Sequence, residues 1–153
     1  RFKLKIPMRV GDVVHKIALA RFSRTLSTLV SSGVDIIKAL EITGATAGNW
    51  VVERSLADIR TRVHEGEPIS QPLQEDPVFP PMVGQMVKIG EETGELDGML
   101  GKVADFYEDE VDTSIKSLTS IIEPILMIGV GIMVGTIVIA MYLPMFKMLT
   151  LIK

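Results

Sequence analysis

The sequence predicts an all-α fold with one transmembrane helix near its C-terminus, and three observations support this prediction. Apolar residues recur at spacings of three and four along most of the chain, without sustained alternation of polar and apolar residues. The segment from Pro124 to Phe146 contains no charged residue. At about 1.5 Å of rise per residue, a helix of this length reaches roughly 34 Å, enough to cross the hydrocarbon core of a bilayer. With 47% hydrophobic residues and a mean hydropathy of +0.35, the composition also indicates contact with lipid.

The first helix is predicted from an apolar stripe that ends before Gly33. Gly33 supplies the left-handed backbone conformation that commonly terminates a helix. Asp35 is placed to cap the next helix, IIKALEITGA, by accepting a backbone N–H bond. The two helices therefore form a predicted helix-turn-helix hairpin. The stripe of the first helix consists of Val14, Ile17, Ala18, Phe22, Leu26, Leu29 and Val30.

A third helix is predicted to start at Asn49, whose side chain suits an N-cap, and to stop at Gly66. Trp50 is interpreted as a core or helix-start anchor. Prolines are frequent in the stretch that follows Gly66. We therefore expect only a short helical turn around ISQPL before Pro80 and the proline after it start another helix.

The stretch IGEETGELDGML, which ends at Leu100, is predicted to be a joint between two helices. One apolar stripe ends near Gly90, and a new one begins at Leu96. Gly94 suits the position just past a helix end, where a positive φ has no steric cost. Asp97 falls in the first turn of the next helix, where negative charge opposes the helix dipole.

Two functional interpretations of the same stretch stay open beside the structural one. Its carboxylates, Glu91 among them, could hold calcium, although the loop lacks the alternating oxygen ligands and closing glutamate of an EF-hand. A pair of carboxylates could also perform acid-base catalysis, which would require a pocket and a raised pKa that a turn this polar does not indicate.

An acidic cluster lies further along the same helix and consists of Glu108, Asp109, Glu110 and Asp112. The cluster is typical of a solvated helix face, and it is also a candidate surface for a basic partner. The two histidines lack metal-ligand spacing and are expected at the surface.

The predicted membrane segment contains two features that a simple anchor, which requires only length and hydrophobicity, does not need. Gly131 and Gly135 form a GxxxG face, on which two helix backbones can approach closely. Glu123 and Pro124 stand where the helix would enter the bilayer. The proline removes a backbone hydrogen bond and favours a bend, while the carboxylate should stay at headgroup level or find a partner.

The composition excludes several classes of function. The chain has no cysteine, so disulfides, thiolate zinc sites and cysteine nucleophiles are excluded. Its 16 basic and 19 acidic residues are interspersed, which gives no continuous basic surface for nucleic acid. RFKLKIPM lacks the apolar core of a signal peptide, and we expect a fragment or processed chain without a targeting peptide.

Several motifs occur in an order that resembles the F domain of type II secretion systems, the inner-membrane platform protein shared with type IV pilus assembly. They are FSRTLSTLVSSGVDIIKALEITG, then Asn49, VHEGEPISQPL, FPPMVGQMVKIGEETGELDGML, and IIEP at the entry to the membrane helix. The resemblance covers nearly the whole chain from Phe22 to Pro124.

The resemblance implies an antiparallel six-helix cytoplasmic bundle followed by one C-terminal transmembrane helix. We expect a membrane-proximal segment over residues 1–11, the helical F domain over 12–118, the membrane helix over 119–146 and a short tail over 147–153. In such a protein Gly33, Asn49, Gly66, Pro80, Gly90, Glu91, Gly94, Leu96 and Asp97 are structural or motif residues.

The resemblance also implies a scaffold for protein transport, without catalytic residues, cofactor or metal. The expected partners are a hexameric assembly ATPase, a pilin or pseudopilin, other inner-membrane assembly proteins, membrane lipid and further copies of the chain, but not nucleic acid. Candidate contact residues are Glu108, Asp109, Glu110, Asp112, Glu123, Pro124, Gly131 and Gly135. The resemblance places the bundle in the cytoplasm of a bacterium, whereas the basic residues that flank the span leave its orientation ambiguous. The alternative is a membrane-tethered helical receptor or signalling adaptor.

Overall fold

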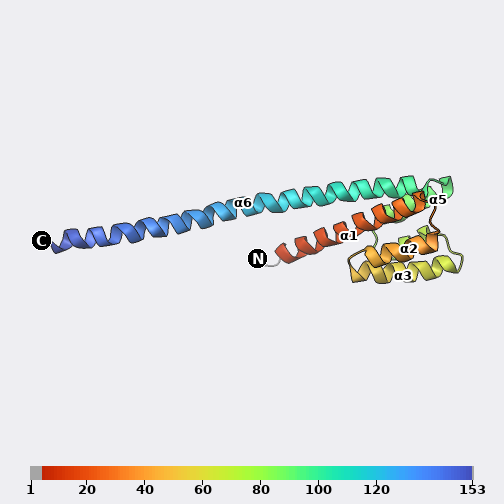
Figure 1. Ribbon diagram of the computed structural model, residues 1–153, viewed down its shortest axis with the longest axis horizontal. Coiled ribbons are helices and arrows are strands. Elements are labelled where there is room, and N and C mark those ends of the chain that lie inside the picture. Colours follow the sequence, from red (N-terminus) through yellow and green to blue (C-terminus); the bar gives the residue numbers. More distant parts are fainter. Residues whose placement is uncertain (1–4, 153) are drawn as a thin grey trace. The chain divides into compact units, whose positions relative to one another are not determined.

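A computed structural model describes the backbone of residues 5–152 and the side chains of residues 10–152 (Figure 1). This part of the chain contains six helices and no strand, which confirms the predicted all-α class. The helices are α1 (Lys5–Ser31), α2 (Ile36–Thr46), α3 (Trp50–His64), α4 (Ser70–Glu75), α5 (Pro81–Thr93) and α6 (Leu96–Leu151).

The chain divides into two compact units, Arg1–Thr113 and Ser114–Lys153. The first unit, called the bundle below, contains α1 to α5 and the beginning of α6. The second, called the C-terminal segment, is helical from Ser114 to Leu151.

The core of the bundle is formed by apolar side chains from all six helices. Helix α2 packs against both α1 and α3, and α4 packs against α5. The rings of Phe22 and Phe79 meet in this core with their centroids 5.1 Å apart. Burial of one such side chain contributes about 1.5–3 kcal/mol. The largest fully buried side chains are Phe22, Leu19, Leu26, Leu40, Leu56, Ile59, Leu73, Leu100, Val52, Val83, Val87 and Val103.

The helix ends follow local signals that the sequence contains. Asp35 accepts a hydrogen bond from the backbone N–H of Ile37 at 3.1 Å, and Asn49 accepts one from Val51 at 2.9 Å. Gly33 and Gly66 follow the ends of α1 and α3 with φ of 81° and 104°. The short helix α4 falls on ISQPL, and α5 starts directly after Pro80.

Two details of the predicted packing are wrong. Trp50 is the first residue of α3, as its interpretation at a helix start has it, but the alternative of a core residue is wrong because its side chain is 71% exposed. The apolar stripe of α1 also continues beyond the core, because Val14 and Ile17 are 49% and 36% exposed whereas Ala18 and Leu19 are buried. Periodicity thus identified one side of α1 but not how far the core extends along it.

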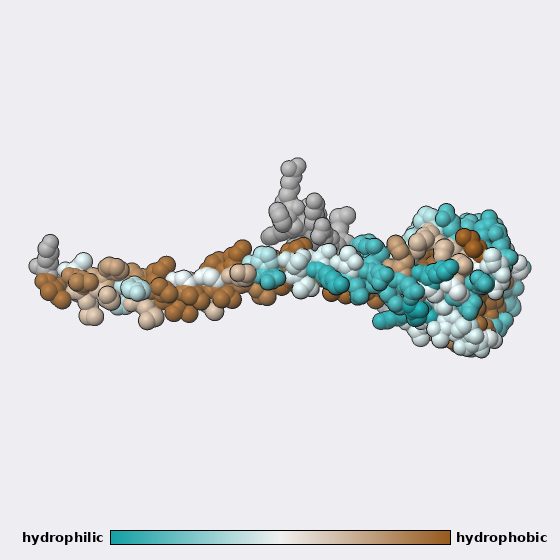
Figure 2. All heavy atoms as spheres, turned by 90° about the horizontal axis from the view of Figure 1, so that it is seen from above, coloured by the Kyte–Doolittle hydropathy of each residue, from teal (hydrophilic) through white to brown (hydrophobic). Residues whose placement is uncertain are grey.

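The C-terminal segment is apolar and its side chains are exposed. Helix α6 is long and apolar enough, by length and composition, to cross a membrane, and it is the one described helix that meets this test. Figure 2 shows hydrophobic residues along this part of α6, in contrast to the mostly hydrophilic surface of the bundle. Pro124 and Pro144 both lie inside α6.

The end of α5 approaches the start of α6 closely at Gly90. A Cβ added at Gly90 would lie 2.8 Å from the Cα of Leu96 and 3.3 Å from its backbone nitrogen. Real Cβ atoms do not come so close to backbone atoms, so the two helices can only meet here because residue 90 has no side chain. By contrast, a Cβ at Gly98 would meet no described atom within 4 Å.

We therefore expect Gly90→Ala to lower the free energy of unfolding by about 1–3 kcal/mol, the usual cost of overpacking. Gly98→Ala is the matched control, since it adds the same methyl group to a helix where there is space. It should raise stability by about 0.5–1 kcal/mol through backbone entropy. Urea denaturation of the full-length protein in detergent measures both effects. Equal midpoints for the two variants would contradict the close approach.

Candidate functional site

The glycine-rich acidic stretch forms the joint between α5 and α6. Helix α5 ends at Thr93, and Gly94 follows with φ of 76° and ψ of 12°, the left-handed conformation. Helix α6 begins at Leu96, with Asp97 in its first turn, and the backbone N–H of Met99 donates to the carbonyl of Glu95 at 3.0 Å. The chain thus reverses within two residues.

Glu91 connects this joint to α4. Its Oε1 accepts a hydrogen bond from the backbone N–H of Ile69 at 2.6 Å, and its Oε2 accepts one from Ser70 at 3.2 Å. Ile69 is the N-cap residue of α4, and an isoleucine side chain cannot accept a hydrogen bond. The Glu91 carboxylate therefore caps α4 from another helix, with the favourable sign of charge for a helix N-terminus.

The other acidic residues of the joint have weaker or different contacts. Glu92 is exposed and lies 4.0 Å from the ammonium group of Lys88. Asp97 contributes its backbone carbonyl, which accepts a hydrogen bond from the Ser27 hydroxyl of α1 at 2.8 Å. No cluster of three or more His, Asp or Glu side chains placed to hold a metal ion occurs among the described residues. The contacts that the joint makes are those of a structural element.

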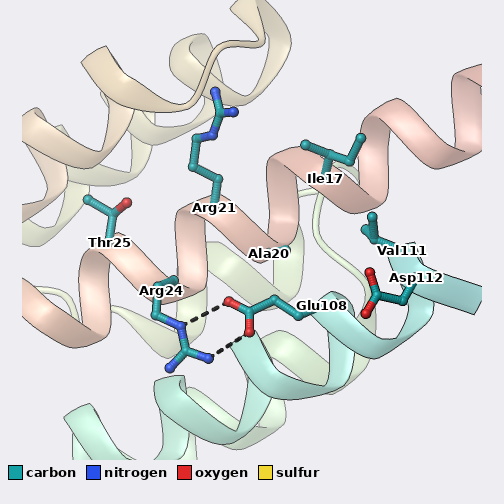
Figure 3. Close-up of a pocket in the computed structure, with 8 residues that line it drawn as sticks. All are labelled: Ile17, Ala20, Arg21, Arg24, Thr25, Glu108, Val111 and Asp112. Atoms are coloured by element: carbon teal, nitrogen blue, oxygen red, sulfur yellow. Dashed lines mark hydrogen bonds and ion pairs between the residues drawn. The ribbon is translucent and has the colours of Figure 1, made fainter. Parts of the chain in front are cut away.

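The acidic face of α6 is held to α1 by two basic residues. Arg24 donates from Nε and Nη2 to the two carboxylate oxygens of Glu108, both at 2.9 Å (Figure 3). Its Nη2 also donates to Asp105. Lys16 donates to Glu110 at 3.1 Å and also pairs with Asp12 one turn away. Two of the four acids in the predicted cluster, Glu108 and Glu110, thus form ion pairs within the bundle.

These contacts change the proton affinity of the groups involved. The Arg24 guanidinium, hydrogen-bonded to the carboxylate, lowers the pKa of Glu108, and the two carboxylates raise the pKa of Arg24. The hydrogen bond to Glu110, followed by the one to Asp12, raises the pKa of Lys16. The directions of these shifts favour the charged forms of Arg24, Lys16 and Glu108, so the ion pairs contribute to the packing of α1 against α6.

The remaining two acids of the cluster, Asp109 and Asp112, are exposed and form no ion pair with any described residue. Asp112 stands at the edge of a groove of about 320 Å³ between α1 and α6 (Figure 3). Ile17, Ala20 and Val111 give the groove an apolar lining, and the Arg24–Glu108 pair lies at its other side. Asp109 and Asp112 are therefore the acids available to a partner.

The candidate contacts of the C-terminal segment are exposed or half-buried in this chain. A Cβ at Gly131 or at Gly135 would meet no described atom within 4 Å, so their helix face is open to another helix. Glu123 is exposed, and Pro124 follows it inside α6. These four residues stay candidate contacts for partners within the membrane.

Sequence reasoning missed the basic side of the contact between α1 and α6. Arg24 and Lys16 are eight residues apart, about two helical turns, and so lie on one face of α1. The acids that pair with them, Asp105, Glu108 and Glu110, lie within two turns of one another on α6. The sequence does show basic residues at helical spacing on α1 and acidic residues at helical spacing on α6. This pattern alone does not identify which helices are neighbours.

Comparisons with known proteins agree with one another. A family model described as type II secretion system (T2SS), protein F, matches residues 22–144. The type IV pilus assembly protein PilC of Thermus thermophilus is 53% identical over 97% of this chain and 37% of its own length. The PilC protein of Myxococcus xanthus is 53% identical over 90% of this chain and 33% of its own length. The type II secretion system protein F of Pseudomonas aeruginosa is 33% identical over 96% of this chain and 36% of its own length. The chain thus spans about a third of the length of these curated relatives.

The capping role of Glu91 can be tested by mutation. We expect Glu91→Ala to lower the free energy of unfolding by about 1.5–3 kcal/mol, because two backbone N–H groups lose a charged acceptor. Glu91→Gln, which keeps one acceptor oxygen without the charge, should have an intermediate effect. Glu92→Ala is the control and should change stability by less than about 0.5 kcal/mol. A denaturation midpoint for Glu91→Ala equal to that of the control would exclude the cap.

The contact between Arg24 and Glu108 should depend on pH. Its contribution is fully present above the unfolded-state pKa of Glu108, for which the ordinary value is 4.5, and is lost as the pH falls through the lower folded-state pKa. We expect Arg24→Met to cost up to about 1 kcal/mol at pH 7, since the pair is exposed to solvent. This difference from the wild type should shrink below pH 4.5.

Arg54→Met is the control for this measurement, because Arg54 is exposed and makes no ion pair with the described residues. Thermal unfolding followed from pH 7 to pH 3 distinguishes the two variants. A constant deficit of Arg24→Met across that range would show that its packing, and not its charge, matters.

Proposed function

This chain belongs to the family of the type II secretion system protein F, and from this membership we propose that it is a non-enzymatic platform protein of a type IV pilus or type II secretion machine. Its relatives carry the names of both systems: PilC is named for type IV pilus assembly and protein F for type II secretion. The proposed place of action is the bacterial inner membrane, with the bundle in the cytoplasm and α6 as the anchor.

One structural observation supports a scaffold more than any other. Residues 96–151 are helical throughout, so no loop separates the core residues Leu100 and Tyr107 from the apolar span that follows Pro124. A single helix thus belongs both to the packed bundle and to the segment that can cross a membrane. Such an arrangement suits a protein that links events in the cytoplasm to events in the bilayer.

The contacts of the bundle agree with this role. Glu91 caps α4, Ser27 connects α1 to the start of α6, and Arg24 holds the acidic face of α6. Each of these polar groups connects one helix to another, as expected of a rigid scaffold.

We propose that the bundle receives a hexameric assembly ATPase from the cytoplasm and that the membrane helix contacts pilins or pseudopilins, other assembly proteins and further copies of the chain. Asp109 and Asp112 are the acids of the bundle most available to a basic surface of the ATPase. Rim charges of this kind set the association rate and its dependence on salt. In the membrane, the uncovered face at Gly131 and Gly135 permits close approach of a second helix.

The test uses the full-length protein and the assembly ATPase of its own host. We expect Asp109→Lys/Asp112→Lys to slow association with the ATPase on the order of tenfold at low salt, with the difference shrinking at high salt as charges are screened. Asp58→Lys/Glu65→Lys, on exposed positions of and beside α3, makes the same change of charge and should bind normally.

Surface plasmon resonance gives the rates, and pilus assembly or secretion in the host gives the function. Equal salt-dependent binding of both double variants would exclude the acidic face as the ATPase contact. If deletion of the full-length protein leaves pilus assembly and secretion intact, the platform role itself is wrong.

A further inference from the structure

An exposed tryptophan stands at the start of α3. The Trp50 side chain is 71% exposed, and that of Val51 beside it is 38% exposed. Tryptophan is highly buried on average in folded proteins, and at protein interfaces it is among the residue types that carry most of the binding energy. Glu53 and Arg54 follow one turn later, on either side of Trp50. These four residues are called the α3 corner below.

The groove between α1 and α6 is the concave counterpart of this corner. Ile17, Ala20 and Val111 give it an apolar lining. Its volume of about 320 Å³ lies at the lower end of the range of small-molecule sites, roughly 300–1,000 Å³, so it has room for one large side chain. A buried tryptophan removes about 150–250 Å² of surface from water, which favours its entry into such a groove.

Two charged side chains of the groove have no ion pair with any described residue. They are Arg21 and Asp112, whereas Arg24 and Glu108 in the same lining pair with each other. Figure 3 shows Arg21 directed away from the Arg24–Glu108 pair. The groove thus offers one free cation and one free anion.

The α3 corner carries the complementary pair of charges. Glu53 and Arg54 are exposed, and neither forms an ion pair with a described residue. A second copy of the corner in the groove would bring Glu53 to Arg21 and Arg54 to Asp112. Opposite charges across an interface fix the partner and its register.

The corner and the groove are neighbours on the bundle. Arg21 lines the groove, and its Nη1 lies 2.7 Å from the position that a Cβ of Gly48 would take. Gly48 precedes Trp50 by two residues. A projecting side chain and a groove that lie next to each other can both be used in one pair of molecules, because a two-fold axis makes each contact occur twice.

We infer that two copies of this chain bind each other through their bundles, with Trp50 of each copy seated in the groove between α1 and α6 of the other. A second copy fits this groove better than an unrelated protein, because both halves of the complementary contact are present on one chain. The inference rests on the proposed function for the presence of several copies at one assembly site. The contact occupies Asp112 and leaves Asp109, which does not line the groove, to the ATPase.

The experiment links the two copies chemically. The full-length protein in detergent, with any cysteines outside this chain replaced, is prepared with one tag and Val51→Cys, or with another tag and Val111→Cys. Each chain then has a single cysteine, so a short bifunctional maleimide can join the two tags only by linking two copies. Thr61→Cys, at an exposed position far along α3, replaces Val51→Cys as the control.

We expect Val51→Cys copies to link to Val111→Cys copies and Thr61→Cys copies not to do so. Trp50→Ala, in both tagged proteins, should lower the yield about tenfold at limiting protein concentration. Since Trp50 is mostly exposed, this change leaves the core of the bundle intact.

A charge exchange identifies the contact. Arg21→Glu in all copies should also lower the yield, because it places two acids opposite each other. Adding Glu53→Arg should restore the yield, and since Arg21 and Glu53 form no ion pair within one described chain, this rescue must act between copies. Adding Asp58→Arg instead gives the same net charge from another exposed acid of α3 and should restore nothing.

Two results would overturn the inference. Absence of a link between Val51→Cys and Val111→Cys copies would exclude a second copy as the occupant of the groove, and equal yields with Glu53→Arg and Asp58→Arg would show that these charges do not meet. Pilus assembly and secretion in the host separate the levels. If deletion of the protein abolishes them but no link forms, the platform role stands and only this contact is wrong.

Discussion

The reversal between α5 and α6 depends on the close approach of two backbones at Gly90 and Leu96, and the packing around the joint depends on that approach. With the chain turned at Gly94, Glu91 reaches the N-terminus of α4 and the carbonyl of Asp97 reaches Ser27 on α1. Contacts that originate within the seven residues from Glu91 to Asp97 thus connect the joint to two further helices, α4 and α1. A motif that looks like an acidic site in the sequence is a structural junction in the fold.

Local signals allowed most of the helix ends to be predicted. Asp35 and Asn49 accept hydrogen bonds from residues two positions later, and Gly33, Gly66 and Gly94 adopt positive φ next to helix ends. These effects involve only residues that are neighbours in the sequence, so they can be predicted from the sequence alone.

Long-range contacts were not predictable in the same way. Glu91 meets a backbone more than twenty residues earlier, and Arg24 meets acids more than eighty residues later. Nothing in the spacing of the acids on α6 distinguishes Glu108, which binds Arg24, from Asp109, which points to solvent. The exposure of Trp50 likewise depends on where the core stops, which is a property of the assembled helices.

The two prolines of α6, Pro124 and Pro144, mark a defined length of helix between them. Because proline has no N–H, the carbonyls of Ser120 and Ala140 lose the partners that residues 124 and 144 would otherwise supply. In hydrocarbon, such a carbonyl costs several kcal/mol unless water or another helix donates to it. Twenty residues separate the two carbonyls, about 30 Å along the axis, which matches the thickness of a bilayer core. In a bilayer, both carbonyls would therefore favour positions near the two water boundaries, and a displacement of the helix along its axis would draw one of them into the hydrocarbon.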